Sequence, residues 1–269
     1  MRILANAILS TLVVLAAGAL TPARLEAAPD KSAKPPPAAK LAPVPAEIRT
    51  RVVAKLHGAS PADVVATPIP GLYEVTMGGL VTYVSEDGKY LVSGNVYDLD
   101  SQVNLTASRR NAARATALAS VREDQMIIFS PPNPKMTVTV FTDVDCGFCR
   151  KFHGQIASVN KAGVQVRYMM FPRTGPGTES WKKAEYVWCA ADRKDALTRA
   201  KKGEPIKGKA CGDAVIKAQY EMGSDLGVEG TPAIFTQSGD YIGGYMTPED
   251  LVEAVQQSQK EAAATASAR

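Results

Sequence analysis

Two cysteines separated by two residues, Cys146 and Cys149, stand between a strand-like and a helix-like segment. Residues 136–141 before them form an almost continuous apolar and β-branched run, which is typical of a strand buried on both faces. Residues 152–159 after them space their apolar side chains as one helical face does. A second buried run follows at 164–171, and this strand–helix–strand order requires a parallel strand pair with a right-handed crossover. The chain is therefore predicted to fold around an α/β unit that carries the cysteine pair at the start of its helix.

This position gives the two sulfurs different chemistry. A helix begins with unpaired backbone N–H groups and the positive end of its dipole, and both stabilise a thiolate. The pKa of Cys146 is therefore expected to lie below the value of about 8.5 of a free thiol, which makes it the attacking sulfur. Cys149, almost one turn deeper and more buried, should stay protonated until it resolves a mixed disulfide. Between them Gly147 and Phe148 carry no charge, and Phe148 offers an apolar surface to an unfolded substrate.

A zinc half-site is an alternative use of the pair. Zinc sites built from four cysteines usually combine two close pairs, whereas Cys189 and Cys211 lie 22 residues apart. Neither has another cysteine or a histidine at ligand spacing, and the whole chain has only two histidines. The sequence thus favours redox use of Cys146 and Cys149, with no metal and no cofactor. A purely structural link between the two is the remaining alternative.

Cys189 and Cys211 are predicted to have a structural role. Cys189 follows an apolar helix-like stretch, where a buried and inert cysteine is expected. A link between the two would close a loop and stabilise the fold by about 3 kcal/mol. A second shuttle pair is the functional alternative, which is disfavoured because neither cysteine stands at a helix start after a strand.

The dipeptide Thr231-Pro232 stands just before the apolar run 233–235, where a proline would normally interrupt a strand. A cis bond would keep Pro232 at the start of the strand and expose the backbone of Thr231. Only about 5% of X–Pro bonds are cis, so the spacing alone does not establish it.

Other polar and aromatic residues near the pair have a commoner structural interpretation. The positive form of His153 could favour the thiolate, but a packed or solvated histidine is the more frequent case. Asp143 could accept the proton of Cys149, although loop carboxylates such as Asp143 and Asp145 more often bind local N–H groups. Trp181 and Trp188 are expected to be packing residues of one helix.

The N-terminus predicts export. Arg2 provides a positive start, residues 3–20 are mostly apolar, and small residues follow. This order is typical of a secretory signal peptide, predicted at 1–28 with cleavage between Ala23 and Ala28, whereas a membrane anchor is the alternative. Disulfides persist in the oxidising compartments outside the cytosol.

The formal net charge of +4 arises from 31 Lys and Arg against 27 Asp and Glu. These charges are evenly spread, which gives no indication of nucleic-acid binding.

Four further regions follow the signal peptide. Residues 29–46 are rich in Pro, Ala and Lys and predict a leader that buries no core. Residues 47–108 combine a helix with strand-like pieces, and a block this small is often stabilised by oligomerisation. The Ala- and Arg-rich stretch 109–123 predicts a linker helix. Residues 124–262 hold the α/β unit, with a helical part and a final helix. The predicted elements are strands at 72–77, 80–85, 89–93, 95–99, 233–236 and 241–244, a hairpin turn at Asp87-Gly88, mostly helix at 179–226, and a last helix from Pro248 capped by Thr247.

These segments resemble the DsbC and DsbG family of periplasmic disulfide isomerases from about residue 47 to the last helix. The segments that carry the resemblance are 141–153 around the cysteine pair, 167–168, 171–173, 188–190, 227–233, and in the N-terminal part 87–89 and 97–98. Two positions depart from related patterns. Phe148 stands where the DsbC members usually have tyrosine, and Val140 stands where thioredoxins bury a carboxylate, as the resemblance to the isomerases expects.

The resemblance implies a fold with three parts: an α+β, cystatin-like dimerisation domain, a linker helix, and an α/β thioredoxin-fold catalytic domain with a helical insertion. It implies a V-shaped periplasmic homodimer that binds misfolded disulfide-containing proteins and is kept reduced by a membrane protein similar to DsbD. It also implies that Cys146 is the nucleophile and Cys149 the resolving thiol. Cys189–Cys211 would be the structural disulfide, and Thr231-Pro232 the cis-proline loop that contacts substrate.

The expected activity is thiol–disulfide isomerisation and reduction, with chaperone activity. A strong oxidase of the DsbA kind typically has a histidine inside the pair, which Gly147 and Phe148 do not provide. The alternatives are a thiol oxidase, or a chaperone and sulfenic-acid reductase similar to DsbG. In that second class the protein holds unfolded chains and the redox pair is secondary.

Overall fold

The computed structural model describes residues 41–206, 208 and 210–267. The predicted signal peptide and the first part of the predicted leader, to residue 40, lie outside the described residues. The last residues of the leader differ from expectation, because Val44 is buried against Ile48 and Val52 of the first helix. Within the described part of the chain, no helix is both long and apolar enough to cross a membrane.

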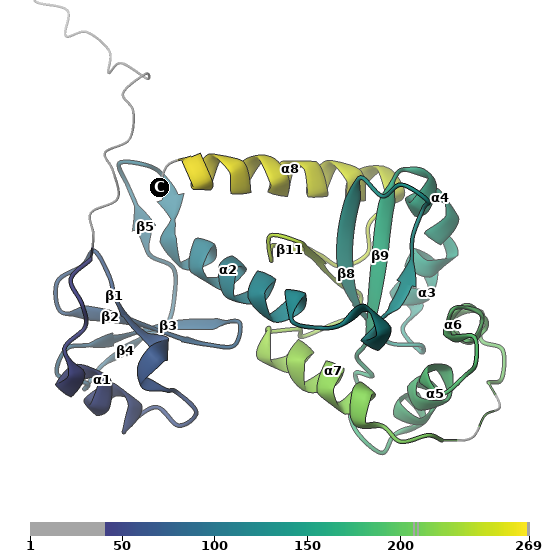
Figure 1. Ribbon diagram of the computed structural model, residues 1–269, viewed down its shortest axis with the longest axis horizontal. Coiled ribbons are helices and arrows are strands. Elements are labelled where there is room, and N and C mark those ends of the chain that lie inside the picture. Colours follow the sequence, from purple (N-terminus) through teal and green to yellow (C-terminus); the bar gives the residue numbers. More distant parts are fainter. Residues whose placement is uncertain (1–40, 207, 209, 268–269) are drawn as a thin grey trace, which may run out of the picture. The chain divides into compact units, whose positions relative to one another are not determined.

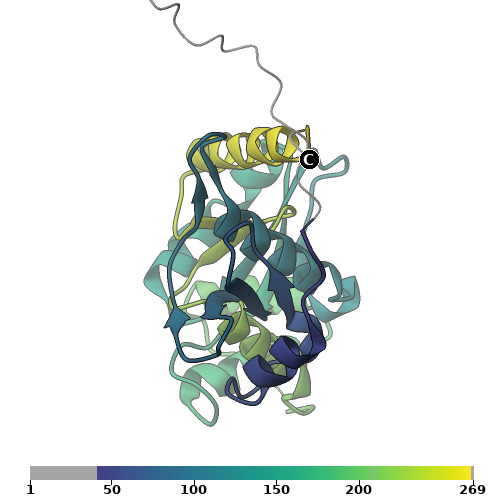
Figure 2. The same ribbon diagram turned by 90° about the vertical axis from the view of Figure 1, so that its left-hand side faces the viewer.

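The N-terminal region is a small α+β unit with its own core (Figures 1 and 2). Its sheet is antiparallel in the order β1-β2-β3-β4, and a separate ribbon pairs β5 with β6. The predicted strands 72–77 and 80–85 are confirmed as β2 and β3, and Gly88 adopts the positive φ of a turn. The elements are α1 (Ala46–Val53), the short 3₁₀ helix η1 (Pro61–Asp63), β1 (Val64–Ala66), β2 (Leu72–Met77), β3 (Leu80–Ser85), β4 (Leu91–Val92), β5 (Tyr97–Asp98) and β6 (Val103–Asn104).

The helix expected at 109–123 is α2 (Leu105–Ala119), which both begins and ends earlier. Its start is set by Asn104, whose side chain accepts a hydrogen bond of 2.9 Å from the N–H of Ala107. The Arg114 guanidinium donates to the carbonyl of Leu226, at the C-terminal end of α7 (Ala214–Asp225). The helix that joins the two regions is therefore attached by side-chain contacts to the second of them.

The C-terminal region contains a five-stranded sheet in the order β11-β10-β8-β9-β7. The expected parallel pair is confirmed: β8 (Met136–Thr142) runs parallel to β9 (Val164–Met170), and the other neighbours are antiparallel. The remaining elements are the 3₁₀ helix η2 (Glu123–Gln125), β7 (Ile127–Phe129), α3 (Gly147–Gly154), α4 (Ile156–Lys161), α5 (Glu179–Trp188), α6 (Arg193–Lys201), β10 (Ala233–Thr236), β11 (Tyr241–Gly243) and α8 (Pro248–Ser267).

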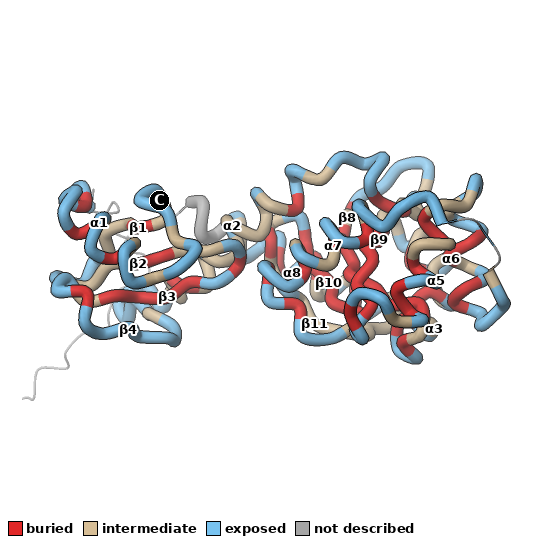
Figure 3. The backbone as a smooth tube through the Cα atoms, turned by 90° about the horizontal axis from the view of Figure 1, so that it is seen from below, coloured by how far each residue is buried: buried red, intermediate tan, exposed pale blue. Residues whose placement is uncertain are grey.

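The central strands β8 and β9 are buried along most of their length, as their continuous apolar sequence predicts (Figure 3). Helix α8 covers this sheet through Leu251 and Val255, and its first turn is capped by the Thr247 hydroxyl (Figure 1). Trp181 and Trp188 on α5 are buried in the same core, in agreement with their predicted packing role.

Candidate redox site around Cys146 and Cys149

The cysteine pair lies where β8 ends and α3 begins. Cys146 is the N-cap of α3, and its sulfur accepts a hydrogen bond of 3.4 Å from the backbone N–H of Cys149. Both cysteines are free thiols. The sulfur of Cys146 therefore occupies the place of an N-cap oxygen, facing the unpaired N–H groups of the first helical turn.

Opposing effects determine the pKa of Cys146, and the result is a value below that of an ordinary thiol. Burial alone would raise it. Thr231, the N–H and thiol of Cys149 and the positive charge of Arg173 all lower it, and together they prevail. The thiolate of Cys146 is thus the favoured form over a wider pH range than for a free cysteine.

The pKa of Cys149 is shifted in the opposite direction. Burial raises it, and this effect exceeds the lowering by the charge of Lys201 and by the nearby Thr142 and Thr231. Cys149 therefore remains a protonated thiol under conditions in which Cys146 is ionised. The two sulfurs have the contrast that attack and later resolution require.

Exposure does not distinguish the two sulfurs. Cys146 is 2% exposed and Cys149 is 1% exposed, so exposed area separates them little, whereas burial raises the pKa of Cys149 and does not prevail at Cys146. The neighbouring Phe148 is 63% exposed and presents its ring to solvent beside the pair.

The loop before β10 lies directly against Cys146. The Thr231–Pro232 bond is cis, and the thiol of Cys146 donates to the Thr231 carbonyl over 3.1 Å. The pairing of Ala233 in β10 with Phe141 in β8 places this loop beside the end of β8, where the pair begins. The structure therefore brings Thr231, Pro232 and Cys146 together.

Asp143 is a buried anchor of the loop between β8 and α3. Its carboxylate accepts hydrogen bonds from the Asp145 N–H (2.9 Å), the Ser180 hydroxyl (2.6 Å) and the Arg173 guanidinium (3.0 Å). Burial would raise its pKa, but these donors lower it overall. A carboxylate held in this way is a poor proton acceptor, so Asp143 fits the structural interpretation and not that of a base for Cys149.

His153 is likewise a packing residue. It is buried, and its ring nitrogens pair with the Tyr168 hydroxyl (3.1 Å) and the Thr198 hydroxyl (3.0 Å). Burial and the nearby charges of Lys201 and Lys202 lower its pKa to about 4. The imidazole is therefore neutral at physiological pH and adds no positive charge beside the thiolate.

Two features near the pair were not predicted from the sequence. Tyr245 lies next to Phe148, with ring centroids 6.2 Å apart, and the ammonium of Lys151 lies 4.4 Å above the Tyr245 ring. Lys201 is buried and donates to Thr142 and Asp143, in the segment just before the pair. A signal for Lys201 existed: it shares the buried side of α6 with Leu197 and Ala200, where a lysine is unusual.

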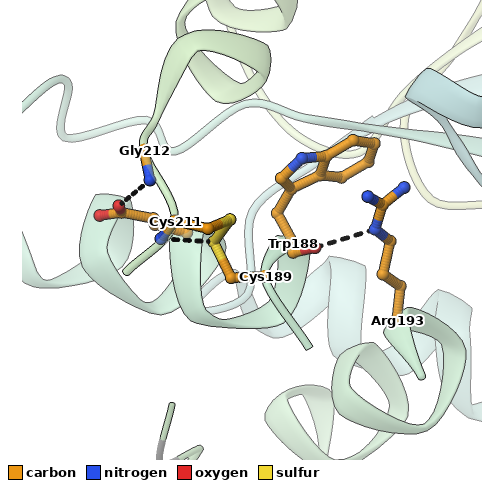
Figure 4. The surroundings of a disulfide bond; sticks show 6 residues. Trp188, Cys189, Arg193, Cys211 and Gly212 are labelled. Atoms are coloured by element: carbon orange, nitrogen blue, oxygen red, sulfur yellow. Dashed lines mark hydrogen bonds between the residues drawn. A yellow bond between two sulfur atoms is a disulfide. The ribbon is translucent and has the colours of Figure 1, made fainter. Parts of the chain in front are cut away.

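Cys189 and Cys211, which both follow the pair in the sequence, form a disulfide (Figure 4). Cys189 caps the C-terminus of α5, and the N–H of Gly212 donates to Glu185 on the same helix. The bond ties the segment before α7 to the end of α5. Trp188 next to it is covered by the Arg193 guanidinium, 3.6 Å from the ring centroid.

Family models match both regions of the chain. The model described as "Disulfide bond isomerase protein N-terminal domain" matches residues 27–107, and that described as "Thioredoxin-like domain" matches residues 122–259. The first match includes the small α+β unit, and the second includes the five-stranded sheet with its cysteine pair.

Curated relatives match most of the chain. Thiol:disulfide interchange protein DsbC of Dickeya dadantii is 38% identical over 197 residues, which are 72% of this chain and 80% of the relative. The protein of the same name from Escherichia coli K12 is 32% identical over 203 residues, 76% of this chain and 84% of the relative. That of Haemophilus influenzae is 37% identical over 193 residues, 72% of this chain and 82% of the relative.

Proposed function

Since this chain belongs to the DsbC family of thiol:disulfide interchange proteins, we propose that it rearranges wrong disulfides in exported proteins as a periplasmic homodimer. The observation that supports this most strongly is the opposite pKa shift of the two thiols at the start of α3. An isomerase needs one sulfur that attacks readily and a second that stays protonated until the bound substrate must be released.

In the proposed reaction the Cys146 thiolate attacks one sulfur of a substrate disulfide. A bond forms between Cys146 and that sulfur, and the other substrate sulfur leaves as a thiolate that takes a proton from water. Another substrate thiolate can then displace Cys146, which completes an isomerisation without net oxidation or reduction. Alternatively, the Cys149 thiolate attacks Cys146 and frees the substrate, so the substrate disulfide is reduced by two electrons and the pair is oxidised.

The surroundings of Cys146 suit a peptide substrate. The cis-proline loop offers backbone next to the sulfur, and we assign substrate contact to Thr231 and Pro232. The exposed ring of Phe148 provides an apolar surface for the unfolded segments that surround a wrong disulfide. The dipeptide of Gly147 and Phe148 contains no histidine, so it lacks the group that favours a strongly oxidising pair.

The proposed dimerisation is supported by apolar side chains on the small N-terminal unit. Strand β4 is at the edge of its sheet, and its residues Leu91 and Val92 are about half exposed. Tyr90, Tyr97 and Leu99 are exposed in the same region of the sequence. Edge strands with exposed apolar residues are suited to pair with another chain, and a second copy would bury them.

The proposed cycle needs a source of electrons. Each reduction leaves the pair as a disulfide, which must be returned to two thiols before the next attack. We propose a membrane reductant similar to DsbD as the partner, in line with the resemblance of the sequence. Export through the signal peptide at 1–28 would bring the chain to this partner.

Reactivation of scrambled ribonuclease tests the proposed function. The purified protein, with a small amount of thiol reductant, should restore ribonuclease activity at a rate proportional to its concentration. It should also reduce insulin. A protein that instead forms disulfides in fully reduced ribonuclease, without rearranging wrong ones, would be an oxidase. Holding substrate in solution with neither reaction would indicate a chaperone whose redox pair is secondary.

Cys149→Ser is expected to accumulate mixed disulfides through Cys146. The attack by Cys146 remains possible, but the thiol that releases a trapped substrate is gone. Non-reducing gels of cells that express the variant should show adducts, and a reductant should cleave them. The double variant with Cys146→Ser is the matched control and should show none. If adducts are absent from Cys149→Ser itself, the assignment of the two roles is wrong.

A further inference from the structure

Lys201 is a buried cation below the cysteine pair, on α6 of the helical part of the domain. Its residue is 4% exposed, and its ammonium donates to the Thr142 hydroxyl (2.6 Å) and to the backbone carbonyl of Asp143 (2.7 Å). Both acceptors are uncharged oxygens. Burial of a lysine ammonium is costly, and buried lysines are rare unless a negative charge compensates for them.

The ionisable group that most favours the charged form of Lys201 is the thiol of Cys149. Burial lowers the pKa of Lys201 to about 8, and among the charges that counteract this lowering Cys149 has the largest effect, ahead of Asp143. Conversely, Lys201 has the largest effect among the groups that lower the pKa of Cys149. The two side chains therefore stabilise one another's charged forms.

The Thr142 hydroxyl is the group through which the two side chains can act on one another. Thr142, the last residue of β8, is buried, accepts a hydrogen bond of 2.6 Å from Lys201 and lowers the pKa of Cys149. With its single proton the hydroxyl can accept from the ammonium and donate to a sulfur at the same time. Donation from a hydroxyl polarised by a cation favours a thiolate over a thiol.

The resolving step needs such help, because burial disfavours the Cys149 thiolate that must attack. Val140, two residues before Thr142 on β8, is buried and apolar, so it provides no charge beside the pair. We propose that Lys201, acting through Thr142, is a positioning residue that stabilises the Cys149 thiolate as it releases a trapped substrate. This inference rests on the proposed function and assigns a role to a residue outside the pair.

Other ionisable groups around the pair do not replace Lys201. Asp143 is held by Arg173 and Ser180, and the charge of Arg173 is coupled more strongly to Cys146 than to Cys149. Tyr168 is buried with its pKa raised, so it is neutral. The remaining ionisable neighbours are Cys146, His153, Arg150 and Lys202. His153 is neutral, and Lys202 lowers its pKa. The charge of Arg150 repels that of Lys201.

Lys201→Met tests the proposal, since methionine is unbranched, of similar length and uncharged. Reaction of the reduced protein with a chromogenic aromatic disulfide should release one coloured thiolate when Cys146 attacks and a second when Cys149 resolves the adduct. Removal of the cation should raise the pH midpoint of the second release by about one unit. At near-neutral pH that step should then be about tenfold slower. The first release should change much less.

Controls separate this role from a structural one. Lys202→Met removes an exposed neighbouring lysine and should leave the second release unchanged. Lys201→Arg keeps the charge and should restore part of the rate. Thr142→Val keeps the shape of the side chain and should shift the midpoint in the same direction as Lys201→Met.

An unchanged midpoint in folded Lys201→Met would overturn the proposal. Should Lys201→Met fail to fold, an unchanged midpoint in Thr142→Val would overturn it equally. Absence of the first release in the unmodified protein would instead contradict the proposed function, so the two failures are distinguishable.

Discussion

Cys146→Ser is expected to reduce insulin reduction and scrambled-ribonuclease reactivation by about a thousandfold or more, to the level without protein. A serine hydroxyl is scarcely ionised at neutral pH, and its oxygen forms no stable bond with a substrate sulfur. The fold should be retained, because residue 146 is the N-cap of α3 and serine is a favoured residue at that position. The loss would therefore reflect chemistry.

Two further measurements check that the loss of activity reflects lost chemistry. Thermal unfolding of Cys146→Ser should match that of the original protein, which separates lost chemistry from lost structure. Suppression of the aggregation of an unfolded protein should persist in the variant if the chain has chaperone activity independent of the thiol. Full ribonuclease reactivation by Cys146→Ser would refute the assignment of the enzyme activity to this pair.

The second large effect is expected from the disulfide between Cys189 and Cys211. Replacement of both by alanine should lower the free energy of unfolding by about 3 kcal/mol, because the 22-residue separation no longer constrains the unfolded chain. Denaturant unfolding at equilibrium under oxidising conditions measures this change. Since the bond lies outside the pair, the folded variant should still reduce insulin.

A reductant provides the matched control for this experiment. Reduction should bring the stability of the original protein close to that of the double variant, while the variant itself should change little. If the double alanine variant proves as stable as the original protein, the bond has no structural role. A variant that is stable but inactive would support the alternative that these cysteines form a second shuttle pair.

The main strands and the cysteine pair were predictable from the sequence because local patterns determine them. The apolar runs at β8 and β9 need burial on both faces, and a pair after such a strand falls at a helix start. Short strands were missed, for example β1 and β7 with three residues each. Such segments are too short for a hydrophobic period, and they are strands only because β2 and β9 pair with them.

The environment of the pair was less predictable, because it is built from residues distant in the sequence. Thr231 lies 85 positions from Cys146, and Lys201 lies 59 positions from Thr142. No periodicity within either segment encodes these contacts. The start of α2 at Leu105 differs from the predicted start at residue 109 because Asn104 caps the helix ahead of the Ala- and Arg-rich stretch.

The central claim is that the start of α3 holds the Cys146 sulfur as a thiolate. Titration of Cys146 in the Cys149→Ser background, followed by the ultraviolet absorbance of the thiolate and by the rate of alkylation, measures this directly. A sulfur stabilised as a thiolate by the helix start should give a midpoint below the value of about 8.5 of a free cysteine. A midpoint at or above that value would contradict this claim.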